Sequence, residues 1–459
     1  MKSTPRITLS RKIAQAALLL TINELPPEVV EKVKIALLDM LSCAFEARNL
    51  PWSRQAIEVA GRAQGKATVI GTPVRASVSE AAFVNAIMGH GLVREDMHTR
   101  SVSHLGVVIF PTLLALAQSK RVIGRDFILG AVCGYEMGAA VGRAVMDQEV
   151  VRIFRPTGIT GPIGGAVAGG RLLGLSEDAL VSAIGLAANT TVGLNEWPKA
   201  GADEMFFQVG FAARNAVTAV ELAELGAYIS ETALDGSAGL FAALQKTDRV
   251  STVNPFAKGE FEIMSVFHKP APACNYAQTP SQAALAVALQ DGLKSSDIVR
   301  IHVKCSAAAL NYPGCDSAGP FERILAAKMS IRYCVAATLA NRRIAESNYR
   351  ALSDPEVMRL VSVTTLEEDP EFTDAYPQLQ GSEVIVTLAD GRTLRHRLPD
   401  LIPANSSEIR LRFREAAGEV LGRPAASAIE SAIDTLENQD DMEILGSLLQ
   451  QNVAVPVSG

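Results

Sequence analysis

Apolar residues recur every three or four positions along most of the first 265 residues, which is typical of helices with one buried face. Two such segments, 7–23 and 28–47, flank Pro26 and Pro27, and proline suits a helix start better than a helix interior. The same periodicity predicts later helices at 126–145, 161–175, 177–188 and 209–226. Alanine and glycine recur there at four-residue spacing and let helices approach closely, so we expect a compact helical domain.

After residue 265 the pattern becomes typical of a small sheet with helices. Segment 295–306 alternates as a strand does, which places Ile298 on one face and Val299 on the other. Segment 382–398 predicts a hairpin, because two alternating runs flank an Asp-Gly turn. Between them, AAKMSIRYCVAATLANRRI predicts one helix. These elements predict a small α+β domain.

The end of the chain returns to the helical pattern. Segments 406–421 and 426–437 are both helix-like and are expected to pack back on the first domain. A chain of 459 residues is too long for one simple core, so two domains are expected.

Composition narrows the class of protein. A hydrophobic content of 48% with 20% charged residues is that of an ordinary soluble globular protein, and a net charge of −6 disfavours nucleic-acid or anionic-membrane partners. Six scattered cysteines without a CxxC pair show no zinc-ribbon or iron–sulfur signature and are expected as reduced thiols in a cytoplasmic protein. The N-terminus is expected to be an ordinary first helix rather than a signal peptide. No stretch approaches the roughly 20 apolar residues of a transmembrane helix.

One polar stretch lies between two apolar, helix-like segments. It spans Asn85 to Leu116 and holds three of the six histidines and two acidic residues, namely His90, Glu95, Asp96, His98 and His104. Titratable residues between apolar helices indicate a loop held rigidly at a pocket, where function tends to lie. The alternative is a solvated connector without function.

Three further clusters carry cationic or polar residues. They are Arg155-Pro156-Thr157-Gly158, the segment 195–201 with Lys199, and the segment 267–276 with Lys269 and Tyr276 at the domain junction. Each alone fits an ordinary role, such as a paired surface arginine, a solvated lysine or a proline-stiffened linker. Together they predict a cation-rich cleft for a carboxylate substrate, since junctions between domains favour pockets.

Two glycine-rich segments do not predict nucleotide binding. GRAQGKAT (61–68) has three residues between its glycines where a phosphate loop needs four. GITGPIGG (158–165) is spaced GxxGxxG and follows no clear strand, so it does not fit a dinucleotide site. Its helix start is still suited to a substrate carboxylate, because backbone N–H groups there favour anions.

Five segments, in order from residue 85 to residue 339, resemble the motifs of one known family. They are NAIMGHGLVREDMH…SHLGVVIFPTLLALA, RPTGITGPIGGAVAGGRLLGL, QVGFAARNAVTAVELAELG, HKPAPACNYAQ and AAKMSIRYCVAATL. The corresponding family motifs are an acidic "DFDD" run ending in a histidine, "HPTG", "HxGxAA", "KPYPACRYTH" and "AKFSLQYAVAAAL". On these motifs the chain is identified as a member of the MmgE/PrpD family, which includes 2-methylcitrate dehydratases, cis-aconitate decarboxylases and iminodisuccinate epimerases.

The resemblance implies a mainly α fold. A large helical domain would be built from both ends of the chain, residues 1–265 and 400–459, with a smaller inserted α+β domain of residues 266–399. It also implies a homodimer and cofactor-independent chemistry in the cleft between the domains. Family members remove a proton or a carboxylate next to a carboxylate group, and cations must stabilise the enolate-like charge that develops.

The resemblance also assigns site residues. Asp96 matches the last aspartate of the acidic run, His104 the histidine that closes the loop, and Lys269 the lysine of "KPYP". Tyr135 and Tyr333 match family tyrosines. Catalysis is therefore assigned to His104, Asp96, Lys269, Lys199 and Tyr135, and substrate binding to Arg155, His98, Arg100, Tyr333 and Tyr276. No metal or other cofactor is expected.

The chain departs from the family pattern at several positions. The first aspartate of the acidic run is Val93, another acidic position is Glu95, and the threonine after the run is Met97. The histidine before "PTG" is Arg155. The family lysine ahead of "HxG" is Met205, the histidine of that motif is Gln208, and the histidine that ends "KPYPACRYTH" is Gln278. Lys199, upstream, is the nearby candidate for the missing lysine, and these changes predict a different substrate from those of known members.

The first hypothesis is a lyase, most simply a hydro-lyase, or a decarboxylase, that acts on a small di- or tricarboxylate. His104 and Asp96 would be acid and base, and Lys269 either a charge stabiliser or a second base. The second hypothesis is an epimerase or racemase with two bases on opposite faces of one carbon. The third is a non-catalytic member that binds a carboxylate metabolite.

Overall fold

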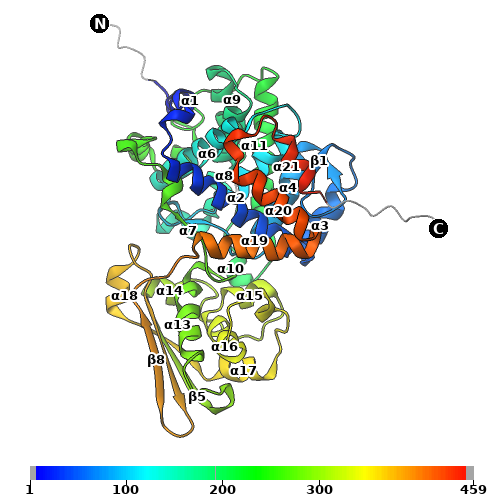
Figure 1. Cartoon of the computed structure of the whole chain (residues 1–459). Coiled ribbons are helices and arrows are strands. Elements are labelled where there is room, and N and C mark those ends of the chain that lie inside the picture. Colours follow the sequence, from blue (N-terminus) through cyan, green and yellow to red (C-terminus); the bar gives the residue numbers. More distant parts are fainter. Residues whose placement is uncertain (1–6, 192, 451–459) are drawn as a thin grey trace, which may run out of the picture.

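The computed structural model describes residues 7–191 and 193–450, and these form two lobes (Figure 1). The helical lobe holds helices from both ends of the chain, whereas the α+β lobe holds a four-stranded sheet and its covering helices. We use these two names for the described residues of 7–265 with 400–450, and for 266–399.

The helical lobe is built from long and short helices in chain order. They are α1 (Leu9–Leu19), α2 (Pro27–Ala47), α3 (Pro51–Ala60), α4 (Val78–His90), α5 (Gly106–Leu116), α6 (Gly124–Val145), α7 (Gln148–Ile153), α8 (Pro156–Leu172), α9 (Glu177–Ala188), α10 (Trp197–Ala200), α11 (Glu204–Glu224), α12 (Leu240–Ala243), α19 (Ser406–Leu421), α20 (Arg423–Asp434) and α21 (Glu443–Leu448). Its strands are short pairs, β1 (Ala67–Thr68) with β2 (Arg75–Ala76), and β3 (Met97–His98) with β4 (Val266–Phe267) of the other lobe. The helices predicted at 28–47 and 177–188 agree with α2 and α9 to within one residue.

Helices α6 and α8 cross closely because both present glycine at the crossing. A Cβ added to Gly134 would lie 2.9 Å from the Cβ of Ala168, and one added to Gly164 would lie 2.9 Å from the Gly134 carbonyl oxygen. Atoms in a packed interior do not tolerate contacts this short. The prediction that small residues let these helices approach closely is confirmed at this crossing.

Helix α6 is the one described helix that is long and apolar enough, by length and composition, to cross a membrane. This corrects the expectation that no segment comes near that limit. Its most apolar window is 94% buried among the other helices, so α6 serves as a core helix of this lobe.

The C-terminal helices pack against the N-terminal ones, as the sequence led us to expect. Phe413 of α19 meets Phe45 of α2 edge to face, with ring centroids 6.2 Å apart. Lys34 of α2 donates to the Asp434 carbonyl oxygen at 2.7 Å and pairs with Glu437. Figure 1 shows α19 and α20, drawn in orange and red, beside α2.

The α+β lobe holds a sheet with the strand order β6-β5-β7-β8. Its strands are β5 (Ile298–Cys305), β6 (Thr364–Glu368), β7 (Ser382–Leu388) and β8 (Thr393–Leu398), and only β5 and β6 are parallel. Its helices are α13 (Gln278–Ala288), α14 (Ala307–Asn311), α15 (Ile324–Met329), α16 (Ile331–Asn341), α17 (Pro355–Ser362) and α18 (Pro370–Ala375). The predicted hairpin is therefore present as β7 and β8.

Two predictions for this lobe need correction. Strict alternation would place Val299 on the same buried face as Ile301. The β5–β7 register shifts between Ile298 and Arg300, so Ile298 is buried instead and Val299 is exposed. The single helix expected across 326–344 is broken at Ser330, whose hydroxyl accepts from the Tyr333 N–H and caps α16.

Candidate active site

The loop between α4 and α5 is buried, which excludes the solvated connector. His90 ends α4, and His104 lies just before α5. The backbone N–H of His104 donates to the Thr157 hydroxyl of α8 at 3.0 Å. The residues His90, Glu95, Asp96, His98 and His104 are all at most 4% exposed. The loop is thus held between helices, as expected of a rigid loop at a pocket.

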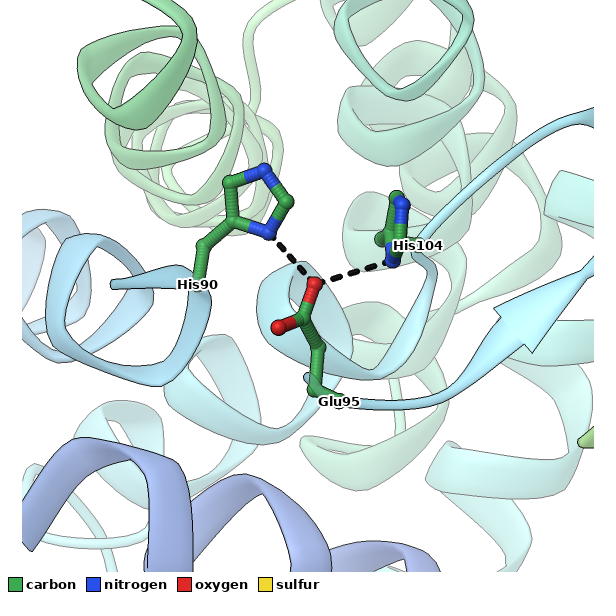
Figure 2. A group of neighbouring side chains, drawn as sticks. All are labelled: His90, Glu95 and His104. Atoms are coloured by element: carbon green, nitrogen blue, oxygen red, sulfur yellow. Dashed lines mark hydrogen bonds and ion pairs between the residues drawn. The ribbon is translucent and has the colours of Figure 1, made fainter. Parts of the chain in front are cut away.

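Glu95 joins two histidines from opposite ends of this loop (Figure 2). Its Oε1 lies 2.5 Å from His90 Nδ1 and 2.9 Å from His104 Nδ1. The two imidazole rings stand 5.0 Å apart, centroid to centroid. One carboxylate oxygen therefore orients both rings.

The hydrogen-bond network assigns the tautomer of each ring. Arginine can only donate, so His90 Nε2 accepts from Arg155 Nη2 at 3.0 Å, and His90 Nδ1 carries the proton. His104 Nδ1 faces both Glu95 and the Asp96 carbonyl oxygen at 2.9 Å, so it is also protonated. His104 Nε2 is then an unprotonated nitrogen with no hydrogen-bond partner among the described residues, which is the state that a general base requires.

Burial keeps both rings neutral. It lowers the pKa of His104 to about 3, although Glu95 opposes this, and it lowers the pKa of His90 as well. Burial would raise the pKa of Glu95, but the two imidazoles hold that pKa well below its usual value. The resting site therefore pairs an ionised Glu95 with two neutral histidines.

Asp96 is the acid candidate of the site. Tyr135 of α6 donates to its Oδ2 at 2.5 Å. Burial raises the pKa of Asp96 to about 7, with Tyr135 opposing, so this carboxyl group is partly protonated near neutral pH. A Cβ added to Gly106 would lie 2.4 Å from the Tyr135 hydroxyl oxygen and 2.8 Å from Asp96 Oδ1, so only glycine allows this approach.

Lys269 reaches the same loop from the α+β lobe. It is fully buried, and its Nζ donates to the Val93 carbonyl oxygen at 2.5 Å and to the Ala273 carbonyl oxygen at 2.6 Å. Burial lowers its pKa to about 8, with Glu95 opposing. Lys269 is therefore a buried cation at neutral pH, and its ammonium group holds the backbone beside Glu95.

Arg155 is the second buried cation, and several polar atoms near it lack partners. Its guanidinium carbon lies 5.2 Å from the centre of the Trp197 ring, and its backbone N–H donates to the Gly193 carbonyl oxygen at 2.8 Å. The Arg155 Nε, the Trp197 Nε1 and the Glu95 Oε2 are buried without a hydrogen-bond partner among the described residues. Buried polar atoms are normally satisfied, so these atoms point to a ligand.

Several predicted site residues lie elsewhere. His98 Nε2 binds Glu262 at 2.8 Å, and the exposed Arg100 binds the same carboxylate at 3.2 Å, so both are committed to one ion-pair network. The Tyr333 hydroxyl donates to the Asn348 carbonyl oxygen inside the α+β lobe. In this structure these three side chains bind other protein groups, and their assignment to substrate binding stays a prediction.

Lys199 and Tyr276 are not part of the buried group either. Lys199 is exposed on α10 and forms no side-chain hydrogen bond or ion pair within the ranges that the structure describes. Its replacement of the family lysine missing at Met205 stays a prediction. The Tyr276 hydroxyl contacts the Tyr376 hydroxyl at 3.0 Å. Tyr276 instead packs 5.3 Å, ring to ring, from Tyr312, whose pKa burial raises to about 12.

His90 and Glu95 were absent from the predicted catalytic set. Both stood in the polar stretch, but Glu95 looked like a departure from a family aspartate, and His90 like the end of a helix. The available signal was the presence of three histidines and two acidic residues within the fifteen residues 90–104. Only the fold shows that the longer glutamate side chain reaches both rings.

His90, Glu95 and His104 are also the described group with suitable atoms for a metal ion, all within 4.8 Å of one another. The donor set fits a hydrogen-bonded triad better. Both Nδ1 atoms face the same oxygen at hydrogen-bond distance, and Arg155 donates to the other nitrogen of His90. Lys269 adds a second positive charge that disfavours a divalent cation at this position.

Comparison with known proteins places the chain in a family. The MmgE/PrpD N-terminal domain model matches residues 11–252, and the MmgE/PrpD C-terminal domain model matches residues 271–438. The chain belongs to the MmgE/PrpD family. The resemblance predicted from its motifs is confirmed, as is the mainly helical fold.

Curated relatives in the MmgE/PrpD family include lyases of two kinds. The cis-aconitate decarboxylase of Aspergillus terreus is 25% identical over 99% of this chain and 98% of its own length. The cis-aconitate decarboxylase-like protein oryM of Aspergillus oryzae is 27% identical over 97% and 98%. The 2-methylcitrate dehydratase-like protein oryR of Aspergillus oryzae is 30% identical over 43% and 42%. These names agree with the predicted enzyme class, an MmgE/PrpD-type lyase.

Proposed function

We propose that this protein is a cofactor-independent lyase that acts on a small di- or tricarboxylate by proton transfer next to a carboxylate group. One observation carries the proposal. An unprotonated His104 Nε2, oriented by Glu95, stands in a buried group with the cations Arg155 and Lys269. A carboxylate bound there would place its acidic carbon beside a base and its developing charge beside two cations.

In a dehydration, His104 Nε2 takes the proton from the carbon next to the carboxylate, and hydroxide leaves with a proton from an acid. Glu95 stabilises the imidazolium that forms, because its carboxylate accepts the Nδ1 proton of the same ring. In a decarboxylation, carbon dioxide leaves first, and the carbanion takes a proton from the acid. Asp96, whose pKa is raised by burial, is the carboxylic acid of this loop that we assign to that step.

The arrangement favours a lyase over an epimerase. Two-base epimerisation needs a second proton acceptor on the opposite face of the carbon. Arg155 stands where the family has a histidine, and an arginine cannot accept a proton in a protein. His90 Nε2 already accepts from Arg155, and Lys269 donates to two carbonyl groups.

The substrate we propose carries an anionic group that Arg155 binds. The Nε of Arg155 and the indole N–H of Trp197 both lack a partner among the described residues and can donate to a carboxylate oxygen. Full-length similarity to cis-aconitate decarboxylases makes an unsaturated tricarboxylate the first compound to test. Val93 and Arg155, in place of the family aspartate and histidine, lead us to expect that a different di- or tricarboxylate is the best substrate.

The decisive experiment incubates the purified protein with a panel of di- and tricarboxylates in D₂O and follows the mixtures by NMR. Loss of water or carbon dioxide from one compound would establish a lyase and name its reaction. Deuterium exchange at one carbon with the skeleton intact would establish the epimerase instead. His104→Gln should lose the activity, whereas His302→Gln, on strand β5, should keep it. Binding of a carboxylate without turnover would contradict the proposal and favour a non-catalytic role.

Replacing Arg155 tests the proposed subsite. Arg155→Gln removes the charge and the donor aimed at the ligand, so KM should rise roughly 10- to 100-fold, as for loss of a charged hydrogen bond. The matched control is Arg332→Gln, whose guanidinium pairs with Asp316 in the α+β lobe. An unchanged KM for Arg155→Gln in steady-state kinetics would move the carboxylate subsite away from Arg155.

A further inference from the structure

Two fully buried lysines of the α+β lobe hold consecutive carbonyl groups of the α4–α5 loop. Lys328 Nζ donates to the Leu92 carbonyl oxygen at 2.9 Å, and Lys269 Nζ donates to the Val93 carbonyl oxygen at 2.5 Å. Glu95, which orients both histidines, follows two residues later. The loop of the helical lobe is therefore fastened by side chains from the other lobe.

The loop needs such fastening because its backbone is strained. Val93 has a φ of +58°, in the left-handed region that a β-branched residue rarely adopts. Such a conformation is energetically unfavourable and persists only where neighbouring contacts enforce it. The two lysine contacts lie on Val93 itself and on the residue before it.

Lys328 has no role left for a substrate. Its charge is matched by Glu346, whose Oε2 lies 2.6 Å from Nζ, and its ammonium group lies 5.2 Å from the centre of the Tyr349 ring. The backbone of Lys328 also accepts from the Cys274 N–H at 2.9 Å, which ties it to the segment that carries Lys269. All of these contacts position other groups.

The site also has to open for a substrate to enter. Arg155 is 7% exposed and His104 is 4% exposed, so in this arrangement the protein covers both residues almost completely. The carbonyl contacts of Lys328 and Lys269 cross between the two lobes. Separation of the lobes would break them and release the strained backbone at Val93.

We propose that Lys328 and Glu346 are positioning residues that couple the docking of the α+β lobe to the assembly of the catalytic group. When the lobes close, Lys328 holds the Leu92 carbonyl, the loop takes its strained form, and Glu95 aligns His90 and His104. When they open, the base is no longer oriented. Its catalytic consequence rests on the proposed function, whereas its structural consequence does not.

Histidine NMR tests the structural consequence without any substrate. The chain has six histidines, so the ring nitrogens of protein labelled with ¹⁵N-histidine can be assigned by single histidine-to-glutamine variants. In Lys328→Met, the ring N–H signals of His90 and His104 should shift or disappear. The signal of His302 on strand β5, bound to Glu367, should stay and show that the α+β lobe is folded, and an unchanged circular dichroism spectrum should show that the helical lobe is folded.

Removing one partner of a buried ion pair leaves the other charge unpaired and destabilises a protein strongly. The double variant Lys328→Met/Glu346→Met avoids this, because it removes both charges and keeps the volume. It still lacks the donor to Leu92, so it should show the same loss of the His90 and His104 signals. Glu346→Gln keeps a hydrogen bond to Lys328 and should show a smaller change.

Lys34→Met is the matched control. Lys34 is also a buried lysine that donates to a carbonyl oxygen, that of Asp434, and pairs with a glutamate, Glu437. These contacts lie wholly within the helical lobe. The variant should lose stability but keep the His90 and His104 signals.

Kinetics tests the catalytic consequence once a substrate is known. The double variant should lower kcat on the order of 100-fold with little change in KM, since small misplacement of a catalytic group costs about that much. Unchanged histidine signals in the folded double variant, or an unchanged kcat on a substrate that the wild-type protein converts, would overturn the proposal. Absence of turnover by the wild-type protein would count against the proposed function alone, because the NMR result stands without it.

Discussion

At the scale of single residues, the site depends on one carboxylate that serves two rings. Glu95 Oε1 accepts from the Nδ1 atoms of both His90 and His104. This contact leaves His104 Nε2 unprotonated and gives the imidazolium that forms during reaction a buried counter-charge. We therefore expect the negative charge of Glu95, rather than the shape of its side chain, to be what catalysis requires.

Glu95→Gln tests that charge. The amide has nearly the same shape but cannot stabilise a protonated His104, so kcat should fall roughly 10²- to 10⁴-fold, the usual contribution of acid–base catalysis. The control is Glu367→Gln, which removes the charge beside the partly exposed His302 and should leave kcat unchanged. Circular dichroism would establish that both variants are folded. Equal kcat values for Glu95→Gln and the wild type would exclude Glu95 from catalysis.

Asp96 predicts a pH dependence of stability. Its pKa is about 7 in the folded protein, above the ordinary value of 3.8, so between these values the folded state binds a proton that the unfolded state has released. The stability that the bound proton confers is complete below the unfolded pKa and is lost as pH rises through the folded pKa. Asp96→Asn removes this titration and keeps an acceptor for Tyr135.

The unfolding temperatures of the wild type and Asp96→Asn should therefore be closest near about pH 4 and diverge as pH rises to about 8, with the variant more stable at the higher pH. Thermal unfolding at several pH values measures this difference. A constant difference across the range would show that Asp96 does not titrate there.

At the scale of elements, close helix crossing and loop strain decide the geometry of the site. Helices α6 and α8 cross through Gly134 and Gly164, and these helices carry Tyr135 and Thr157 to the α4–α5 loop. The loop itself adopts the left-handed backbone at Val93 only under contacts from the other lobe. Each helix alone has regular geometry, and the close packing of these elements brings the site residues together.

Two glycine-to-alanine substitutions should change stability in opposite directions. Gly164→Ala puts a Cβ 2.9 Å from a backbone oxygen, so it should lower the free energy of unfolding by about 1–3 kcal/mol. Gly418→Ala in α19 meets only a flexible arginine side chain at 3.7 Å and should raise it by about 0.5–1 kcal/mol, because alanine favours helix. Denaturant unfolding measures both. A Gly164→Ala variant more stable than the wild type would show that α6 and α8 can move apart without loss of stability.

At the scale of the whole molecule, the two lobes meet around the catalytic loop. Strand β3 of the loop pairs with β4, Lys269 and Lys328 cross from the α+β lobe, and the C-terminal helices return to the helical lobe. Closure of the lobes therefore both excludes water and completes the site, which strengthens electrostatic stabilisation.

The homodimer implied by the family stays a prediction at this scale. Leu225 and Tyr228, after α11, are 85% and 93% exposed, and such large apolar side chains favour an interface. Light scattering should give twice the mass of one chain, and Leu225→Glu/Tyr228→Glu should shift the mass toward the monomer. A monomeric wild-type protein would contradict this expectation.

The sequence by itself determined the periodic elements. The helix over 28–47, the hairpin of β7 and β8, and the family motifs around His104 and Lys269 could all be read from local pattern. Such patterns are local because a helix or a hairpin repeats within a few residues. The helix break at Ser330 and the register shift at Val299 could not be predicted, because a helix cap and a strand register depend on neighbours outside the repeat.

Only the tertiary structure decided the partners of the polar side chains. Glu95 instead of Asp96 binds the two histidines, His98 turns to Glu262, and Lys269 holds a backbone carbonyl. These contacts join residues up to 176 positions apart in the chain. A buried polar group must find a partner, but which partner it finds depends on how distant segments pack, and no local pattern records that.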